Sequence, residues 1–141
     1  MTQKTLLPSD CFSSKILPVV NLSTIEQAKR ILPLLLDAEI DVIELTLRNE
    51  SALEVVNWCC ENQKEICIGV GTVCQPRDLE KVVSAGARFA VSPGQTIELL
   101  EKAKQLKIPF LPGVMTPSDI LLVQQAGYQE AKFFPAQQAG G

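Results

Sequence analysis

The sequence contains no histidine. This absence excludes Ser-His and Cys-His nucleophile pairs, and it excludes every metal site that is built on imidazole ligands. Acid–base chemistry must therefore come from carboxylate, lysine, tyrosine or cysteine side chains.

The cysteines are few and show no pairing pattern. Their number is odd, no two of them have Cys-x-x-Cys spacing, and a chain of 141 residues can build its core without disulfide bonds. We therefore expect reduced and mostly buried thiols at Cys11, Cys59, Cys60, Cys67 and Cys74.

A surplus of positive charge and a long apolar run are also missing. The 13 basic and 16 acidic residues give a net charge of −3 without any Lys/Arg cluster, which offers no general attraction to nucleic acid or to an anionic membrane. The N-terminal lead, residues 1–14, lacks the apolar core of a signal peptide, and the most apolar run, 31–36, is short and contains Pro33. The sequence predicts a cytoplasmic protein.

Beyond this lead, short apolar runs alternate with longer amphipathic segments, and no linker or low-complexity stretch divides them. The alternation predicts one domain of tight βα units over residues 1–141 that share a parallel sheet. Six strands are expected at 16–20, 42–47, 66–70, 88–91, 109–114 and 130–134. Five helices are expected at 24–37, 51–61, 76–85, 96–106 and 117–126.

Several helix starts carry recognisable signals. Ser23 and Glu26 have the spacing of a capping box, and Pro76 and Pro117 fall in the first turns of their helices. Pro33 is the exception, because it lies inside a helical pattern and predicts a kink there.

Two parallel folds fit the alternation, a doubly wound nucleotide-binding sheet and a (β/α)8 TIM barrel. The segment Gly69-Val-Gly-Thr-Val-Cys74 follows a strand but lacks the third glycine of a dinucleotide motif, and no Walker lysine is present. Polar or special residues instead stand at the carboxyl end of one strand after another, where barrel enzymes keep their chemistry. These residues are Arg48, Thr72, Ser92-Pro93-Gly94, Gly113, and Lys132 with Pro135. The barrel is therefore favoured.

The second expected strand, Asp41-Val-Ile-Glu-Leu-Thr-Leu-Arg48, alternates strictly with period two. Glu44, Thr46 and Arg48 share one face, and in a parallel sheet covered by helices both faces are buried. Buried polar groups of this kind need partners or a ligand. A structural Glu44–Arg48 ion pair is the plain alternative to a binding site.

Lys132 lies in Ala-Lys-Phe-Phe-Pro, within a strand expected to be interior. Burial disfavours the ammonium form and supplies neutral amine, which attacks carbonyl carbon to form a Schiff base. A nearby Glu44 carboxylate would oppose that effect. Together with Arg48 and Thr72 as carboxylate binders and Glu44 as a proton shuttle, Lys132 points to a site for a 2-oxo acid.

At these residues the chain resembles the class I family of 2-keto-3-deoxy-6-phosphogluconate (KDPG) and 4-hydroxy-2-oxoglutarate aldolases. The resemblance extends over nearly the whole chain from about residue 13. It rests on ordered motifs: Pro18-Val-Val20, Val42-Ile-Glu-Leu-Thr-Leu-Arg48, Gly69-Val-Gly-Thr-Val73, Phe89-Ala-Val-Ser-Pro-Gly94, Pro109-Phe-Leu-Pro-Gly113 and Lys132-Phe-Phe-Pro-Ala136.

The resemblance implies roles for the candidate residues. Lys132 would be the Schiff-base lysine and Glu44 the general acid/base, while Arg48 and Thr72 would bind the pyruvyl carboxylate. Pro93 and Phe134 would shape the pocket. The family is a (β/α)8 barrel, usually a homotrimer, that needs no metal or other cofactor and cleaves KDPG to pyruvate and glyceraldehyde 3-phosphate, or 4-hydroxy-2-oxoglutarate to pyruvate and glyoxylate.

A complete barrel takes about 200–250 residues, so the sequence predicts a C-terminally truncated member with six of the eight βα units. In the family, strands seven and eight hold the substrate phosphate. Two alternatives stay open: a weakly active or inactive fragment that serves as an assembly component, and a 2-oxo-acid decarboxylase that uses the same lysine.

Overall fold

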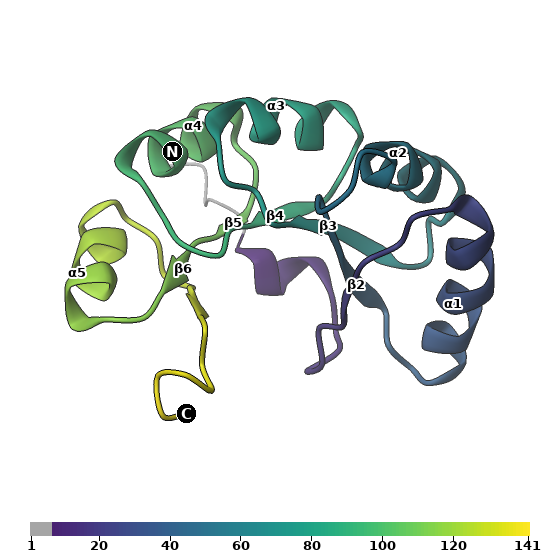
Figure 1. Cartoon of the computed structure of the whole chain (residues 1–141), viewed down its shortest axis with the longest axis horizontal. Helices are drawn as coiled ribbons and strands as arrows, with labels where there is room; N and C mark the ends of the chain where they lie inside the picture. The colour runs from purple at the N-terminus through teal and green to yellow at the C-terminus, as the bar shows by residue number, and fades with distance from the viewer. Residues whose placement is uncertain (1–6) are drawn as a thin grey trace.

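The computed structural model describes residues 7–141, which form a curved, all-parallel sheet followed by a short parallel strand pair (Figure 1). The larger sheet has the order β1-β2-β3-β4-β5, and β6 pairs with β7. The strands are β1 (Val19–Val20), β2 (Val42–Thr46), β3 (Cys67–Gly71), β4 (Phe89–Val91), β5 (Phe110–Leu111), β6 (Gly113–Val114) and β7 (Lys132–Phe133). Each strand of the larger sheet lies beside its neighbour in the sequence.

This order decides between the two folds that the sequence allows. A doubly wound sheet reverses its strand order at a switch point, whereas here the order never reverses along β1 to β5. The α/β fold of the (β/α) barrel type is confirmed. The doubly wound alternative is wrong.

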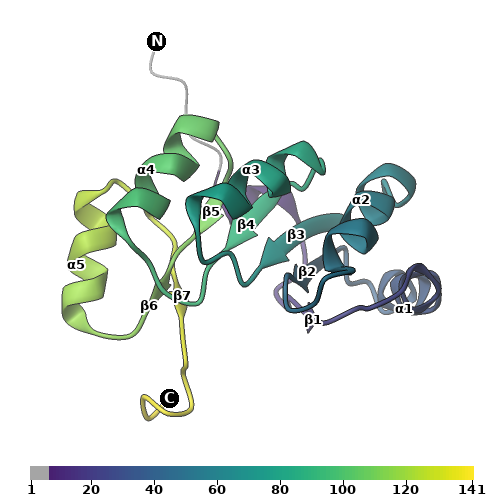
Figure 2. The same cartoon turned by 45° about the horizontal axis from the view of Figure 1, so that its top comes forward.

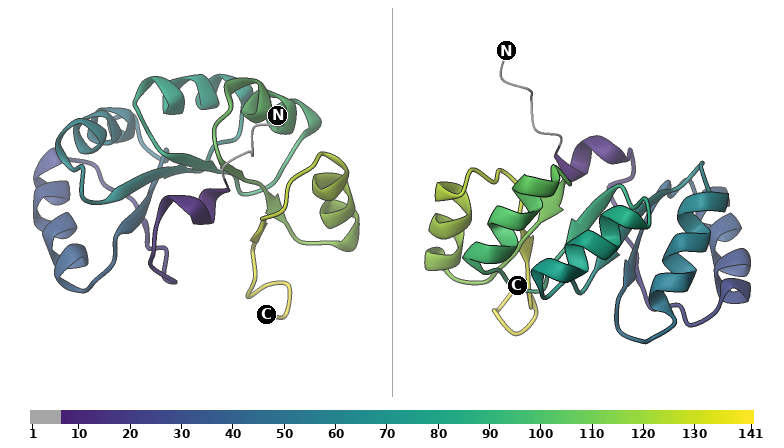
Figure 3. Two further views of the ribbon diagram at one scale, coloured as in Figure 1. Left: turned by 180° about the vertical axis from the view of Figure 1, so that it is seen from behind. Right: turned by 90° about the horizontal axis from the view of Figure 1, so that it is seen from above.

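Helices cover one face of the curved sheet. They form an arc on its convex side (Figure 1), and they lie side by side when the molecule is seen from above (Figure 3). No helix within residues 7–141 is long and apolar enough to cross a membrane. The helices are α1 (Ile25–Asp37), α2 (Ala52–Asn62), α3 (Pro76–Ser84), α4 (Ile97–Leu106) and α5 (Pro117–Gln125).

The expected strand at 109–114 is present as two short strands, β5 and β6, separated by Pro112. β5 pairs with β4 through Ala90 and Phe110, whereas β6 pairs with β7 through Gly113 and Lys132. The backbone polar groups of successive residues face opposite sides, so Leu111 serves the β4 side, where its carbonyl accepts from the Ser92 N–H at 3.2 Å, and Pro112 serves the β7 side. The Pro112 carbonyl still accepts a hydrogen bond from the Lys132 backbone N–H at 2.9 Å. The two short strands therefore occupy one barrel position.

The start of α1 differs from the predicted cap by one residue. Thr24, not Ser23, is the N-cap, and its Oγ1 accepts a hydrogen bond from the Gln27 N–H at 3.2 Å. The Gln27 side chain accepts in return from the backbone N–H groups of Ser23 and Thr24. The pair Thr24 and Gln27 has the same capping-box spacing as Ser23 and Glu26, so spacing alone could not separate the two. The helix continues through Pro33 to Asp37.

The N-terminal segment packs under the concave side of the sheet, as Figures 1 and 2 show. Of the expected lead, residues 1–6 lie outside the described residues, and Pro8–Cys11 form a 3₁₀ helix, η1. Phe12 stacks on Phe89 with ring centroids 5.7 Å apart. The backbone N–H groups of Ser13 and Ser14 donate to the Asp41 carboxylate at 2.7 and 2.9 Å, and these hydrogen bonds hold the pKa of Asp41 below its usual value. The segment is thus fastened to the strand that carries Glu44.

All five cysteines are free, but they are not uniformly buried. Cys59 and Cys67 are buried, and burial raises the pKa of each thiol to about 12. Cys11 and Cys60 are half-buried. Cys74 is exposed, so the expectation of burial is wrong for this residue, which lies in the loop that follows β3.

The inner face of β3 carries glycine at the point where the Phe89 ring of β4 crosses it. A Cβ on Gly69 would lie 2.1 Å from Phe89 Cζ, and Phe89 is fully buried, so the ring cannot move aside cheaply. Gly94 provides the contrast, because a Cβ there would meet no heavy atom within 4 Å.

We expect Gly69→Ala to lower the free energy of unfolding by about 1–3 kcal/mol, because the added methyl overpacks the barrel interior. Gly94→Ala should change the same quantity by less than about 0.5 kcal/mol. Urea denaturation followed by circular dichroism measures both. Equal stability of the two variants would contradict the close packing of β3 against β4.

Candidate active site

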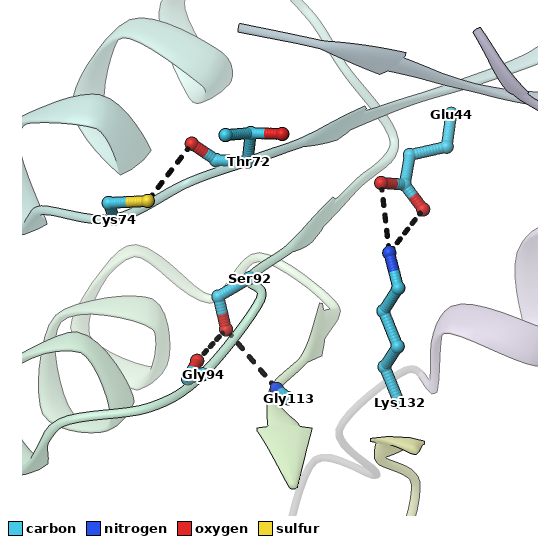
Figure 4. A network of polar contacts seen from close by, with 7 residues as sticks. All are labelled: Glu44, Thr72, Cys74, Ser92, Gly94, Gly113 and Lys132. Atoms are coloured by element: carbon cyan, nitrogen blue, oxygen red, sulfur yellow. Dashed lines mark hydrogen bonds and ion pairs between the residues drawn. The ribbon is translucent and has the colours of Figure 1, made fainter. Parts of the chain in front are cut away.

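Lys132 and Glu44 meet inside the curved sheet. Lys132 Nζ lies 3.3 Å from Glu44 Oε1 and 3.4 Å from Oε2, and Figure 4 shows the two side chains pointing toward one another. The Glu44 side chain is 2% exposed, and the Lys132 side chain is 24% exposed. The carboxylate is therefore sealed inside the protein while the amine still reaches solvent.

The alternation of β2 places the acid here. Glu44 lies between Ile43 and Leu45, which are buried in the main core between the sheet and the helices. Successive side chains of a strand point to opposite faces, so Glu44 points to the concave side. The parallel register then sets Glu44 beside Gly69 of β3, and Lys132 beside Gly113 of β6.

Gly71 of β3 makes room for the Glu44 carboxylate. A Cβ on Gly71 would lie 1.9 Å from Glu44 Oε1, which no real contact permits. The acid side chain therefore lies across the backbone of β3, and a side chain at position 71 would displace it. In the sequence this glycine belongs to an incomplete dinucleotide motif and to the resemblance motif Gly69-Val-Gly-Thr-Val73, neither of which assigns it a role at the site. The period-two spacing of Gly69 and Gly71 beside an inward-facing Glu44 is the signal that could have identified it.

Phe134 lies close to the amine, with Lys132 Nζ 5.1 Å from the centroid of its ring. A cation at this distance from an aromatic ring is attracted by the ring face. The ring is 37% exposed and so forms part of the open side of the site.

Three other predicted residues lie at the carboxyl ends of strands and make no hydrogen bond or ion pair with Lys132 or Glu44. Arg48 is exposed two residues after β2, and no ion pair to Glu44 is present, so the alternative of a Glu44–Arg48 pair is wrong. Thr72 directly follows β3 and has a φ of 61°, a left-handed conformation that a β-branched residue rarely adopts. Pro93 is exposed in the turn after β4. All three lie at the same end of a parallel sheet.

Ser92 ties the Pro93 turn to β6. Its hydroxyl donates to the Gly94 carbonyl and accepts from the Gly113 N–H at 3.4 Å (Figure 4). Gly113 is again a position without room for a side chain, because a Cβ there would lie 2.2 Å from the Pro93 carbonyl oxygen. Since Gly113 is the register partner of Lys132, this contact fixes the Pro93 turn next to the strand that carries the amine.

Lys132 and Glu44 are the paired ionisable side chains of this site. Within residues 7–141, no group of three or more Cys, Asp and Glu side chains is placed to hold a metal ion. The raised pKa values of the buried thiols Cys59 and Cys67 keep them protonated and poorly nucleophilic. An amine beside a carboxylate, as in the Lys132–Glu44 pair, can act as a nucleophile, because the carboxylate can take or return its proton.

Comparison with known proteins gives a consistent result. The aldolase family described as KDPG and KHG aldolase matches residues 8–141. The 2-dehydro-3-deoxy-phosphogluconate aldolase of Dickeya dadantii is 39% identical over 126 residues, which make up 89% of this chain and 59% of that protein. The KHG/KDPG aldolase of Escherichia coli K12 is 37% identical over 138 residues, 98% of this chain and 65% of that protein.

A solved structure extends the likeness to three dimensions. The crystal structure of KDPG aldolase from Legionella pneumophila, with pyruvate captured at low pH as a covalent carbinolamine intermediate, matches with a TM-score of 0.92 and 39% identity. The match covers 96% of this chain and 66% of that one. The chain thus spans about three fifths of the length of the curated relatives that it matches.

We expect Lys132→Met to lower the free energy of unfolding by about 2–4 kcal/mol, because it leaves a buried carboxylate without its ionic partner. Lys102→Met is the matched control. The Lys102 side chain is 23% exposed, much like Lys132, but its partner Glu80 is 56% exposed. An exposed pair contributes at most about 1 kcal/mol. Denaturant unfolding of both variants tests the difference, and equal losses would mean that Glu44 is well solvated.

Proposed function

Because the chain belongs to the KDPG and KHG aldolase family, we propose that it is a class I aldolase whose Schiff-base lysine is Lys132. The proposed reaction is cleavage of KDPG to pyruvate and glyceraldehyde 3-phosphate, or of 4-hydroxy-2-oxoglutarate to pyruvate and glyoxylate. The observation that carries the proposal is the Lys132–Glu44 contact at 3.3 Å, with the acid buried and the amine open to solvent.

The first step is imine formation. Glu44 takes a proton from the Lys132 ammonium group across their contact, which leaves a neutral amine. The amine attacks C2 of the 2-oxo acid, and the resulting carbinolamine loses its hydroxyl as water when Glu44 returns the proton. The product is an iminium ion, which withdraws electrons from C3.

Cleavage then follows from the same pair of groups. Glu44 removes the proton of the C4 hydroxyl, directly or through a water molecule, the C3–C4 bond breaks, and its electrons move into the iminium to give an enamine. The aldehyde leaves. Glu44 delivers the proton to C3, and water hydrolyses the iminium to release pyruvate and restore the Lys132 amine.

Residues at the strand ends supply binding in this proposal. The Arg48 guanidinium can hold the substrate carboxylate through two parallel hydrogen bonds, and Thr72 adds its hydroxyl or backbone N–H. The left-handed backbone of Thr72 supports that role, because strained residues of this kind occur where a site requires a fixed donor direction. Pro93 and Phe134 shape the pocket in this proposal, and the Phe134 ring lies 5.1 Å from the Lys132 amine.

We expect incubation with pyruvate and sodium borohydride to add one pyruvate-derived group irreversibly to Lys132, because borohydride reduces the imine to a stable amine. Peptide mass spectrometry locates the adduct. Lys132→Met should abolish labelling, and Lys102→Met should leave it unchanged. An adduct confined to other lysines, or no adduct on the folded chain, would contradict the assignment of Lys132.

Turnover separates an aldolase from a fragment that acts only in an assembly. The exposed apolar side chains of Met115, Leu121 and Phe133 near β6 and β7 favour association with further chains, including the proposed homotrimer.

We expect pyruvate release from both substrates in a lactate-dehydrogenase-coupled assay. Glu44→Gln should lower the rate of this release about 100-fold or more. Light scattering on the same sample gives the oligomeric state. Imine trapping without pyruvate release would support the assembly role instead.

A further inference from the structure

Thr46 carries a buried hydroxyl whose partner is missing from the resting site. The residue is 3% exposed. Its Oγ1 is one of two buried side-chain nitrogen or oxygen atoms within residues 7–141 that have no hydrogen-bond partner. An unpaired buried hydroxyl destabilises a protein, so a buried polar group in this state calls for a physical reason. None of the hydrogen bonds and ion pairs described above involves its side chain.

Thr46 lies on the same face of β2 as the Glu44 carboxylate. The two residues are two positions apart on the strand, so their side chains point to the same side. The register pairs Thr46 with Gly71, and Glu44 Oε1 occupies a point 1.9 Å from the Cβ position that Gly71 lacks. Neighbouring strands are about 4.8 Å apart. The carboxylate therefore lies across from the Thr46 side chain, and one rotation about χ1 brings the hydroxyl toward it.

We propose that Thr46 is a positioning residue that donates a hydrogen bond to the Glu44 carboxylate when Lys132 leaves the ion pair to form the imine. This inference rests on the proposed function. In the resting state both Glu44 oxygens face the Lys132 amine, at 3.3 and 3.4 Å. Once the nitrogen is bonded to C2 it has fewer N–H groups to offer. The Thr46 hydroxyl then holds one carboxylate oxygen and leaves the other free to move protons.

The arrangement accounts for the unpaired hydroxyl. A permanent Thr46–Glu44 hydrogen bond would fix the carboxylate in the absence of substrate, whereas a bond made only in the imine state acts when the acid must face C3 and C4. A hydrogen bond to a charged acceptor is about twice as strong as one between neutral groups. The interaction therefore contributes most after Lys132 has reacted.

The first test separates imine formation from proton transfer. Pyruvate methyl protons exchange with deuterium when an enzyme forms the enamine reversibly, and NMR follows the loss of the methyl signal. We expect Thr46→Val to leave borohydride trapping at Lys132 unchanged and to slow methyl exchange about tenfold, with Thr46→Ser restoring the rate to within about twofold. Unchanged exchange in Thr46→Val, or parallel losses of trapping and exchange, would overturn the proposal.

The second test needs no catalysis, and it keeps this proposal separate from the aldolase assignment. We expect Thr46→Val to leave the thermal unfolding midpoint unchanged or raise it in the parent chain, since valine has no hydroxyl to satisfy. In the Lys132→Met background the same substitution should lower the midpoint, because Thr46 is then the donor left for Glu44. Equal shifts in the two backgrounds would overturn the Thr46–Glu44 interaction. A failure of pyruvate to trap on the parent chain would instead contradict the aldolase assignment and the imine-dependent step, while a lower midpoint in the Lys132→Met background would still support the Thr46–Glu44 hydrogen bond.

Discussion

The structure depends on a buried carboxylate that is paired with one amine. Glu44 is enclosed in the concave side of the sheet, and Lys132 is its ionic partner within the described residues. Burying a charged carboxylate costs desolvation free energy unless an oppositely charged partner lies within ion-pair distance. The requirement explains why β7 must lie where it does, since its register with β6 brings the amine to the acid.

Closely approaching backbone segments shape the surroundings of this pair. Gly71 leaves the space that the carboxylate fills, and Gly113 lets the Pro93 turn approach the strand beside Lys132. In both places an added methyl would collide with backbone or with the acid itself. The concave side is thus shaped by the missing side chains of two strands, β3 and β6, and the Glu44 carboxylate occupies the space beside Gly71.

Much of the fold could be predicted from the sequence because its pattern is regular. Alternating apolar runs located the βα units, and the strict period of β2 put Glu44 on the inner face. Details that depend on contacts between distant segments were beyond reach. The predicted N-cap of α1 was wrong by one residue, because Thr24 and Gln27 have the same spacing as Ser23 and Glu26. The division at Pro112 follows from pairing on opposite sides by β4 and β7, which no local pattern records.

The site shows the same limit. Lys132 and Glu44 were both identified from their surroundings, but the sequence also allowed a Glu44–Arg48 pair within one strand. The long-range Lys132–Glu44 contact replaces it, and Arg48 stays exposed. Its place among the carboxylate binders rests on its position at the end of β2 and stays a prediction.

The two members of the pair are 88 residues apart in the chain. During synthesis the units that carry β2 to β4 emerge first, and domains begin to organise from the N-terminus as they appear. Glu44 would then be enclosed by strands already paired around it, with no cation to balance its charge until β7 arrives. Docking of β7 beside β6 is therefore favoured electrostatically as well as by hydrophobic burial, so the Lys132–Glu44 ion pair also helps to hold β7 in place.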